Sequence, residues 1–141
     1  MDFDQLKKAI SRFEEMLNAH KNDSAKRTEL EQDAIQDSLV KRFEYTLEVA
    51  WKSCKRYLHE EGFGEAATGS PKSIMRLAAE AGMIRGAENW IRYIDARQSI
   101  SYNYSQEKAD QVLAVVDDFY EDAIGLYRTM SGESRDRWDA N

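Results

Sequence analysis

The chain has 141 residues, of which 42% are hydrophobic and 33% are charged, and its formal net charge is −6. This composition is typical of one folded soluble domain and excludes an intrinsically disordered chain. Because the net charge is negative, a role in binding nucleotides requires a local basic pocket. The sequence has no long apolar run, no apolar core of a secretory signal and no cysteine other than Cys54. We therefore expect a cytoplasmic protein without a disulfide or a membrane span.

Two helices are predicted first in chain order. Apolar residues step by three and four over residues 3–20, which predicts the first helix there. Thr28 and Glu31 form a capping box, in which the threonine side chain accepts from the Glu31 amide and Glu31 reaches back. An apolar stripe that no glycine or proline interrupts before Gly62 then predicts a second helix of roughly 50 Å, which needs packing partners along its length.

Glycine and proline divide the middle of the chain. Residues 62–69 are rich in glycine and alanine and predict a loop. Ser70 and Pro71 predict the start of a short helix, because serine caps a helix and proline suits its first position. Gly82 is expected to end this helix, since the left-handed position after a helix favours glycine. A helical spacing of apolar residues resumes over residues 90–97.

The last long helix is predicted from the apolar spacing over residues 109–127, with Asn103 or Ser105 as its cap. Residues 100–104 just before it alternate between apolar and polar types, as in a short strand. The sequence offers no second strand for pairing, so we interpret this stretch as a helix end and a turn.

These elements amount to four main helices and one short helix. Short connections favour antiparallel neighbours, so the predicted fold class is all-α, an antiparallel four-helix bundle with one short extra helix. We expect a single domain over residues 1–130 and a polar C-terminal tail over residues 131–141. Aromatic side chains on the helices are expected in the core or at a dimer or partner interface: Phe43, Tyr45, Trp51 and Trp90.

The sequence shows little that indicates catalytic chemistry. His20 and His59 are predicted on different helices without other ligands at a metal-binding spacing, and no Glu-x-x-His motif occurs, so neither a metal nor another cofactor is expected. Cys54 lies on the apolar stripe of the second helix, where a small buried core residue is expected rather than a nucleophile. No glycine-rich phosphate loop is present.

Arg97, Tyr102 and Tyr104 remain as candidates for a binding site. An arginine near a helix end can hold an anion through two hydrogen bonds, and a tyrosine can stack on a base or exchange hydrogen bonds. Alternatively, Arg97 pairs with Asp95 or a neighbouring helix while the tyrosines pack under the loop. From spacing alone, the packing alternative is favoured.

Three blocks of sequence, taken together, resemble a known family. They are RFEYTLEVAWKSCKRYL at residues 42–58, SPKSIMRLAAEAGMI at residues 70–84 and NWIRYIDARQSISYNY at residues 89–104. In this order they resemble the nucleotidyltransferase substrate-binding protein family, a branch of the HEPN superfamily, over about residues 30–126. The resemblance implies a helical bundle, usually a homodimer. It also implies that this chain binds the substrate while a separately encoded minimal nucleotidyltransferase performs metal-dependent nucleotidyl transfer.

Some relatives of this family form toxin–antitoxin pairs. In those pairs the HEPN chain is a ribonuclease with the motif Arg-Asn-x-x-x-His-x-Tyr, and the nucleotidyltransferase silences it by adenylylating the tyrosine. The resemblance places Arg97 at the arginine and Tyr104 at the final tyrosine, which makes Tyr104 the matching position for adenylylation. Gln98 stands at the asparagine position and Tyr102 at the histidine position.

The tyrosine at the histidine position changes the expected chemistry. RNA cleavage through the 2′-hydroxyl needs a group that exchanges protons near neutral pH, as histidine does, whereas tyrosine has a reference pKa of about 10. The sequence therefore favours a non-catalytic subunit that binds a nucleotide, an RNA end or another anion through Arg97, Gln98, Tyr102 and Tyr104. The alternatives are a ribonuclease toxin with a degenerate motif and a helical interaction module without a ligand.

Overall fold

The computed structural model describes residues 2–22, 26–98 and 106–133 of the chain. These residues form six α-helices and one short 3₁₀ helix, without a strand, which confirms the all-α class. The elements in chain order are α1 (Asp4–Lys21), α2 (Glu29–Glu60), η1 (Gly64–Thr68), α3 (Pro71–Glu80), α4 (Glu88–Gln98), α5 (Gln106–Leu113) and α6 (Val116–Ser131).

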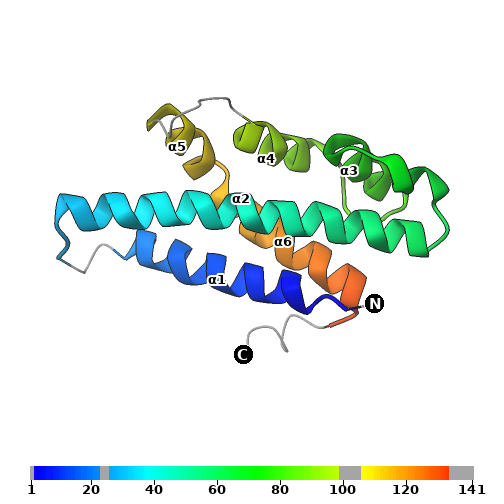
Figure 1. The fold of residues 1–141 in the computed structure, drawn as a ribbon, viewed down its shortest axis with the longest axis horizontal. Coiled ribbons are helices and arrows are strands. Elements are labelled where there is room, and N and C mark those ends of the chain that lie inside the picture. Colours follow the sequence, from blue (N-terminus) through cyan, green and yellow to red (C-terminus); the bar gives the residue numbers. More distant parts are fainter. Residues whose placement is uncertain (1, 23–25, 99–105, 134–141) are drawn as a thin grey trace.

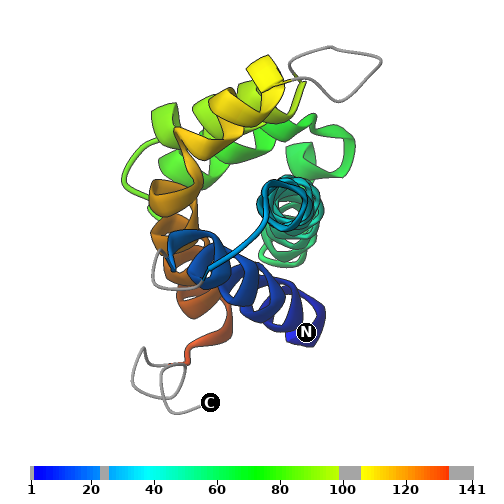
Figure 2. The ribbon, with the colours of Figure 1, turned by 90° about the vertical axis from the view of Figure 1, so that its left-hand side faces the viewer.

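The long helix α2 extends along the molecule and the other helices pack around it. α1 runs antiparallel to α2, and α3 and α4 follow one another back along α2 (Figure 1). Figure 2, which looks nearly along α2, shows α1, α6 and the segment from α3 to α5 curving around it. The helices therefore form a bundle around α2. The part of the chain that runs back along α2 after η1 is divided into the short helices α3 and α4.

The capping box at the start of α2 forms as the sequence predicts. The Thr28 hydroxyl accepts from the Glu31 amide at 3.1 Å, and the Glu31 carboxylate accepts from the Thr28 amide at 3.2 Å. The helix then continues for 32 residues, or about 48 Å, without an internal glycine or proline. The local signals at its two ends thus locate this helix correctly.

Removing this cap should destabilise the protein. Thr28→Ala leaves the Glu31 amide without its side-chain acceptor, so we expect the free energy of unfolding to fall by about 1 kcal/mol. Urea denaturation followed by circular dichroism measures the change. Thr28→Asp keeps an acceptor at the same position and should remain within about 0.5 kcal/mol of the parent. Equal losses in both variants would contradict the capping role.

The middle of the chain follows the prediction at three positions and departs from it at one. Ser70 caps α3, Pro71 occupies its first turn, and Gly82 adopts a φ of +78° just after it ends. The predicted loop at residues 62–69, however, contains the 3₁₀ helix η1. Ala66 in η1 is fully buried, so packing of this small side chain against the core favours an ordered turn there.

The single long helix predicted near the C-terminus is wrong, because the structure divides it into α5 and α6. The helical pattern ends at Leu113, where the Val115 amide donates to the Val112 carbonyl at 2.9 Å. Val112, Val115 and Val116 are all buried. A break in the helix allows closely spaced valines of the apolar run to face the core on both sides of the break.

An aromatic cluster forms the centre of the core. Phe119 on α6 makes edge-to-face contacts with four rings, at centroid distances of 5.5, 4.9, 5.9 and 5.3 Å: Phe13, Phe43, Trp90 and Tyr93. These rings come from α1, α2 and α4, so the cluster joins four helices. Two aromatic residues expected in the core or at an interface, Phe43 and Trp90, are therefore placed in the core of the described chain.

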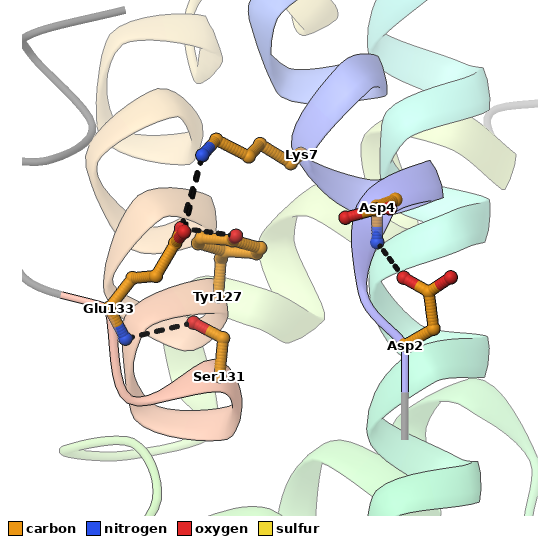
Figure 3. Close-up of polar contacts among 6 residues, drawn as sticks. All are labelled: Asp2, Asp4, Lys7, Tyr127, Ser131 and Glu133. Atoms are coloured by element: carbon orange, nitrogen blue, oxygen red, sulfur yellow. Dashed lines mark hydrogen bonds and ion pairs between the residues drawn. The ribbon is translucent and has the colours of Figure 1, made fainter.

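The end of α6 is fastened to α1. Glu133 accepts from Lys7 at 3.3 Å and from the Tyr127 hydroxyl, while its amide donates to the Ser131 hydroxyl at 3.2 Å (Figure 3). Burial, followed by this hydrogen bond to Glu133, raises the pKa of Tyr127 to about 12. The first residues of the expected polar tail, 131–133, thus pack on the domain, and residues 134–141 lie outside the described part.

Candidate functional site

Arg97 lies at the C-terminal end of α4, where this helix approaches α2. Its Nη1 atom donates to the Glu48 carboxylate at 2.7 Å, and its side chain is 36% exposed. The Nε atom of Arg97 is buried and has no hydrogen-bond partner among the described residues. Arg97 therefore pairs with a residue of the neighbouring helix α2, and the structure shows no bond to Asp95, which pairs with Lys72 at 2.7 Å instead.

Glu48 connects Arg97 to two further side chains of α2. Its carboxylate accepts from the Lys52 ammonium at 2.8 Å and from the Trp51 indole at 3.4 Å. The hydrogen bond from Lys52, supported by the charge of Arg97, lowers the pKa of Glu48 despite its partial burial. Glu48 is therefore ionised at neutral pH, and we call these four residues the Glu48 cluster: Glu48, Trp51, Lys52 and Arg97.

The Glu48 cluster has one net positive charge, since it combines two cations with one carboxylate. Lys55 adds a further cation on the same helix, with its ammonium 5.9 Å from the centre of the Trp51 ring and 3.2 Å from the Gly69 carbonyl. This is the local basic surface that an acidic chain requires for anion binding. The described residues can thus attract an anion at the end of α4.

The described residues around Arg97 form an open surface rather than a closed pocket. The cavity beside Arg97 measures only about 10 Å³, enough for at most one water molecule. Gln98 lines it as the exposed last residue of α4. The other predicted binding residues, Tyr102 and Tyr104, lie outside the described residues, as do the candidate caps Asn103 and Ser105 and the residues 100–104 interpreted as a turn.

The remaining aromatic candidates occupy two environments. Trp51 is partly buried against the core, and its indole N–H points to Glu48, so it belongs to the site as well as to the packing. Tyr45 is 53% exposed, and its hydroxyl accepts from Gln5 at 3.1 Å. Tyr45 is therefore a surface residue of α2 and is available for contact with another molecule.

Glu48 and Lys52 are functional candidates that the site predicted from the sequence did not include. They are four positions apart on α2, which is the spacing of a helical ion pair, and both lie in the first block of the family resemblance. That local pattern was visible in the sequence. Their contact with Arg97 was not, because it depends on how α4 packs against α2.

The described histidines and carboxylates do not gather into a metal site. Within the part of the chain that the structure describes, no group of three or more histidine, cysteine, aspartate or glutamate residues could hold a metal ion. His20 is on α1 and His59 is exposed on α2. In the same described ranges, no helix is both long enough and apolar enough to cross a membrane.

Cys54 is a core residue, and its reactivity should reflect this. Burial leaves the thiol without solvent and raises its pKa to about 12. We therefore expect native protein at about pH 8 to resist a thiol-specific disulfide reagent, because almost no thiolate is present or accessible. In concentrated urea the single thiol should react fully. Rapid reaction of the native protein in an absorbance assay would contradict this placement.

Comparisons with known proteins identify the family to which this chain belongs. The family described as "Nucleotidyltransferase substrate binding protein like" matches residues 1–132. The chain therefore belongs to that family, as the three sequence blocks predicted.

Individual relatives agree with this assignment. A protein of Haemophilus influenzae named "Probable ribonuclease HepT" is 34% identical over 90 residues, which span 62% of this chain and 62% of that protein. A solved structure from Haemophilus influenzae, described as revealing the fold of a substrate binding domain of a nucleotidyltransferase, is 26% identical. It superimposes with a TM-score of 0.81 over 92% of this chain and 99% of that one.

A second solved structure supports the fold alone. It comes from Thermus thermophilus, is 23% identical and gives a TM-score of 0.69 over 89% of this chain and 98% of that one. The helical architecture is thus shared with proteins whose sequences have diverged widely.

Proposed function

We propose that the chain is the non-catalytic, substrate-binding subunit of a two-component nucleotidyltransferase. The observation that carries this proposal is the Glu48 cluster, which holds the Arg97 guanidinium at the end of α4 with one net positive charge. A guanidinium in this setting can bind a phosphate or carboxylate through charge-assisted hydrogen bonds. The family supports a partnership with a nucleotidyltransferase.

The described part of the site binds an anion better than it moves a proton. Glu48 accepts three hydrogen bonds and its pKa is lowered, so it is a weak base at neutral pH. The Arg97 guanidinium offers only hydrogen-bond donors and has no acceptor. His59, a histidine on the same helix as Glu48, is seven positions beyond Lys52 and thus lies about 10 Å along the helix axis from this residue of the Glu48 cluster. The proposed ligand is a nucleotide, an RNA end or another anionic group, with Gln98, Tyr102 and Tyr104 as further binding residues.

A ribonuclease is the second candidate, and the name of the Haemophilus influenzae relative favours it. In that function the chain would be a toxin that a nucleotidyltransferase antitoxin neutralises through Tyr104. Tyr102 would then have to replace the histidine of the motif.

One measurement decides between these functions, and a second tests the partnership with a nucleotidyltransferase that both of them include. Purified protein is incubated with RNA beside an Arg97→Ala variant, and cleavage by the parent that disappears in the variant would overturn the binding-only proposal. In the second, the separately encoded nucleotidyltransferase is mixed with the chain, and a stable complex on size-exclusion chromatography supports the two-component function. Failure to form any complex would refute that function.

The proposal also includes a homodimer in the cytoplasm. The exposed aromatic Tyr45 and the length of α2 provide a surface for a second copy. Light scattering of the purified chain should give twice the chain mass, and a monomer mass across micromolar concentrations would exclude the dimer.

A further inference from the structure

A groove separate from the Glu48 cluster lies at the opposite end of α4. It measures about 590 Å³ and is lined by the turn at residues 82–86, the first residues of α4 and one face of α6. None of the residues that line it belongs to the Glu48 cluster. The proposed binding site therefore does not account for this groove.

One residue that lines the groove is a glycine, although the helical backbone of α6 does not need a glycine at this position. Gly125 is in the middle of α6, and a Cβ atom built on it would meet nothing within 4 Å. Glycine is a poor helix former, so alanine or a larger residue would suit the helix better. The absence of a side chain at this position keeps the groove open beside the partly buried Met83 and Ile84.

The groove carries an excess of negative charge. Among the described residues that line it, Glu88, Glu121 and Asp122 supply three carboxylates and Arg85 supplies one guanidinium. Asp122 is held by the Tyr93 hydroxyl and by Asn89 at 3.5 Å, so its position is set by the core. A surface that presents lysine or arginine next to an apolar side chain is complementary to this groove in charge and in polarity.

We propose that this groove is the docking surface for the nucleotidyltransferase partner, through a basic and partly apolar segment of that partner. The inference rests on the two-component function proposed above. α4 has 11 residues, so its two ends are about 16 Å apart. A partner the size of a small domain, about 30 Å across, that is seated at the start of α4 can therefore also reach an anion held by Arg97 at its end.

The test compares two variants of the groove with a matched control. Glu88→Lys/Glu121→Lys reverses two charges in the groove, and Gly125→Leu fills it without changing charge. Asp33→Lys/Asp37→Lys makes the same change in net charge on the exposed N-terminal part of α2. Isothermal titration of the full-length chain with the purified nucleotidyltransferase measures each dissociation constant.

We expect both groove variants to raise the dissociation constant for the partner at least about tenfold, because like charges or a filled groove oppose docking. The control should remain within about twofold of the parent. Nucleotide binding by the isolated variants should match that of the parent, and their thermal midpoints should not fall far below its midpoint, which shows that the fold and the Arg97 site are intact.

Other outcomes would overturn the inference in distinguishable ways. If the partner binds the parent and both groove variants equally, the groove is not its docking surface, while the two-component function stands. If the partner does not bind the parent, both proposals fail. If the groove variants change the mass of the isolated chain in light scattering and leave partner binding unchanged, the groove joins two copies of this chain.

Discussion

Replacing Phe119 by alanine should lower the free energy of unfolding by about 3–5 kcal/mol, the largest effect on stability that we expect from a single substitution. Phe119 is fully buried and contacts rings from three other helices, with the shortest centroid distance, 4.9 Å, to Phe43. The truncation removes buried apolar surface and also the edge-to-face contacts. Surrounding rings on separate helices can only partly fill the cavity.

The matched control for this experiment is Phe3→Ala. Phe3 is only partly buried and contacts one ring, Tyr57, at 6.2 Å, so its loss should cost less than about 1.5 kcal/mol. Urea denaturation followed by circular dichroism provides both values through a two-state fit. A cost for Phe119→Ala no larger than that for Phe3→Ala would show that the cluster does not hold the bundle together.

Replacing Arg97 by alanine should weaken anion binding at least about tenfold, because it removes a charge-assisted donor at the proposed site. Tenfold corresponds to about 1.4 kcal/mol. The effect on folding should stay within about 1 kcal/mol, since the pair with Glu48 is partly exposed and Glu48 keeps its bonds from Lys52 and Trp51. Binding and stability should therefore separate in this variant.

Arg92→Ala is the control for charge. Arg92 is exposed on the same helix and contacts Asn89 and Asp118, at 3.1 and 3.8 Å, away from the Glu48 cluster. Fluorescence titration with nucleotides and short RNA should give nearly the parent affinity for Arg92→Ala. If both variants lose the same affinity, the parent binds through general charge and Arg97 has no specific role.

The helix boundaries show where reasoning from sequence succeeds and where it stops. The start of α2 and the start of α3 were predictable, because Thr28, Glu31, Ser70 and Pro71 act on their own backbone within three residues. The division between α5 and α6 was not predicted, because no glycine or proline marks it. It depends on how the buried valines fit against the other helices.

The candidate site was likewise predictable from the sequence only in part. The motif resemblance identified Arg97, and the helical spacing of Glu48 and Lys52 was readable in the sequence. Their contact with Arg97 could not be predicted from the sequence, since Arg97 and Glu48 belong to different helices. The prediction that Tyr102 and Tyr104 complete the site stays a prediction, because both lie outside the described residues.

The sequence by itself determined the helical class, the caps of α2 and α3 and membership of the family, because periodicity, caps and motifs depend on residues that are neighbours in the chain. The tertiary structure decided which carboxylate holds Arg97, how Phe119 joins four helices and where the groove beside Gly125 opens. These features depend on the angles and distances at which whole helices pack. Side-chain volumes along their entire length set that packing.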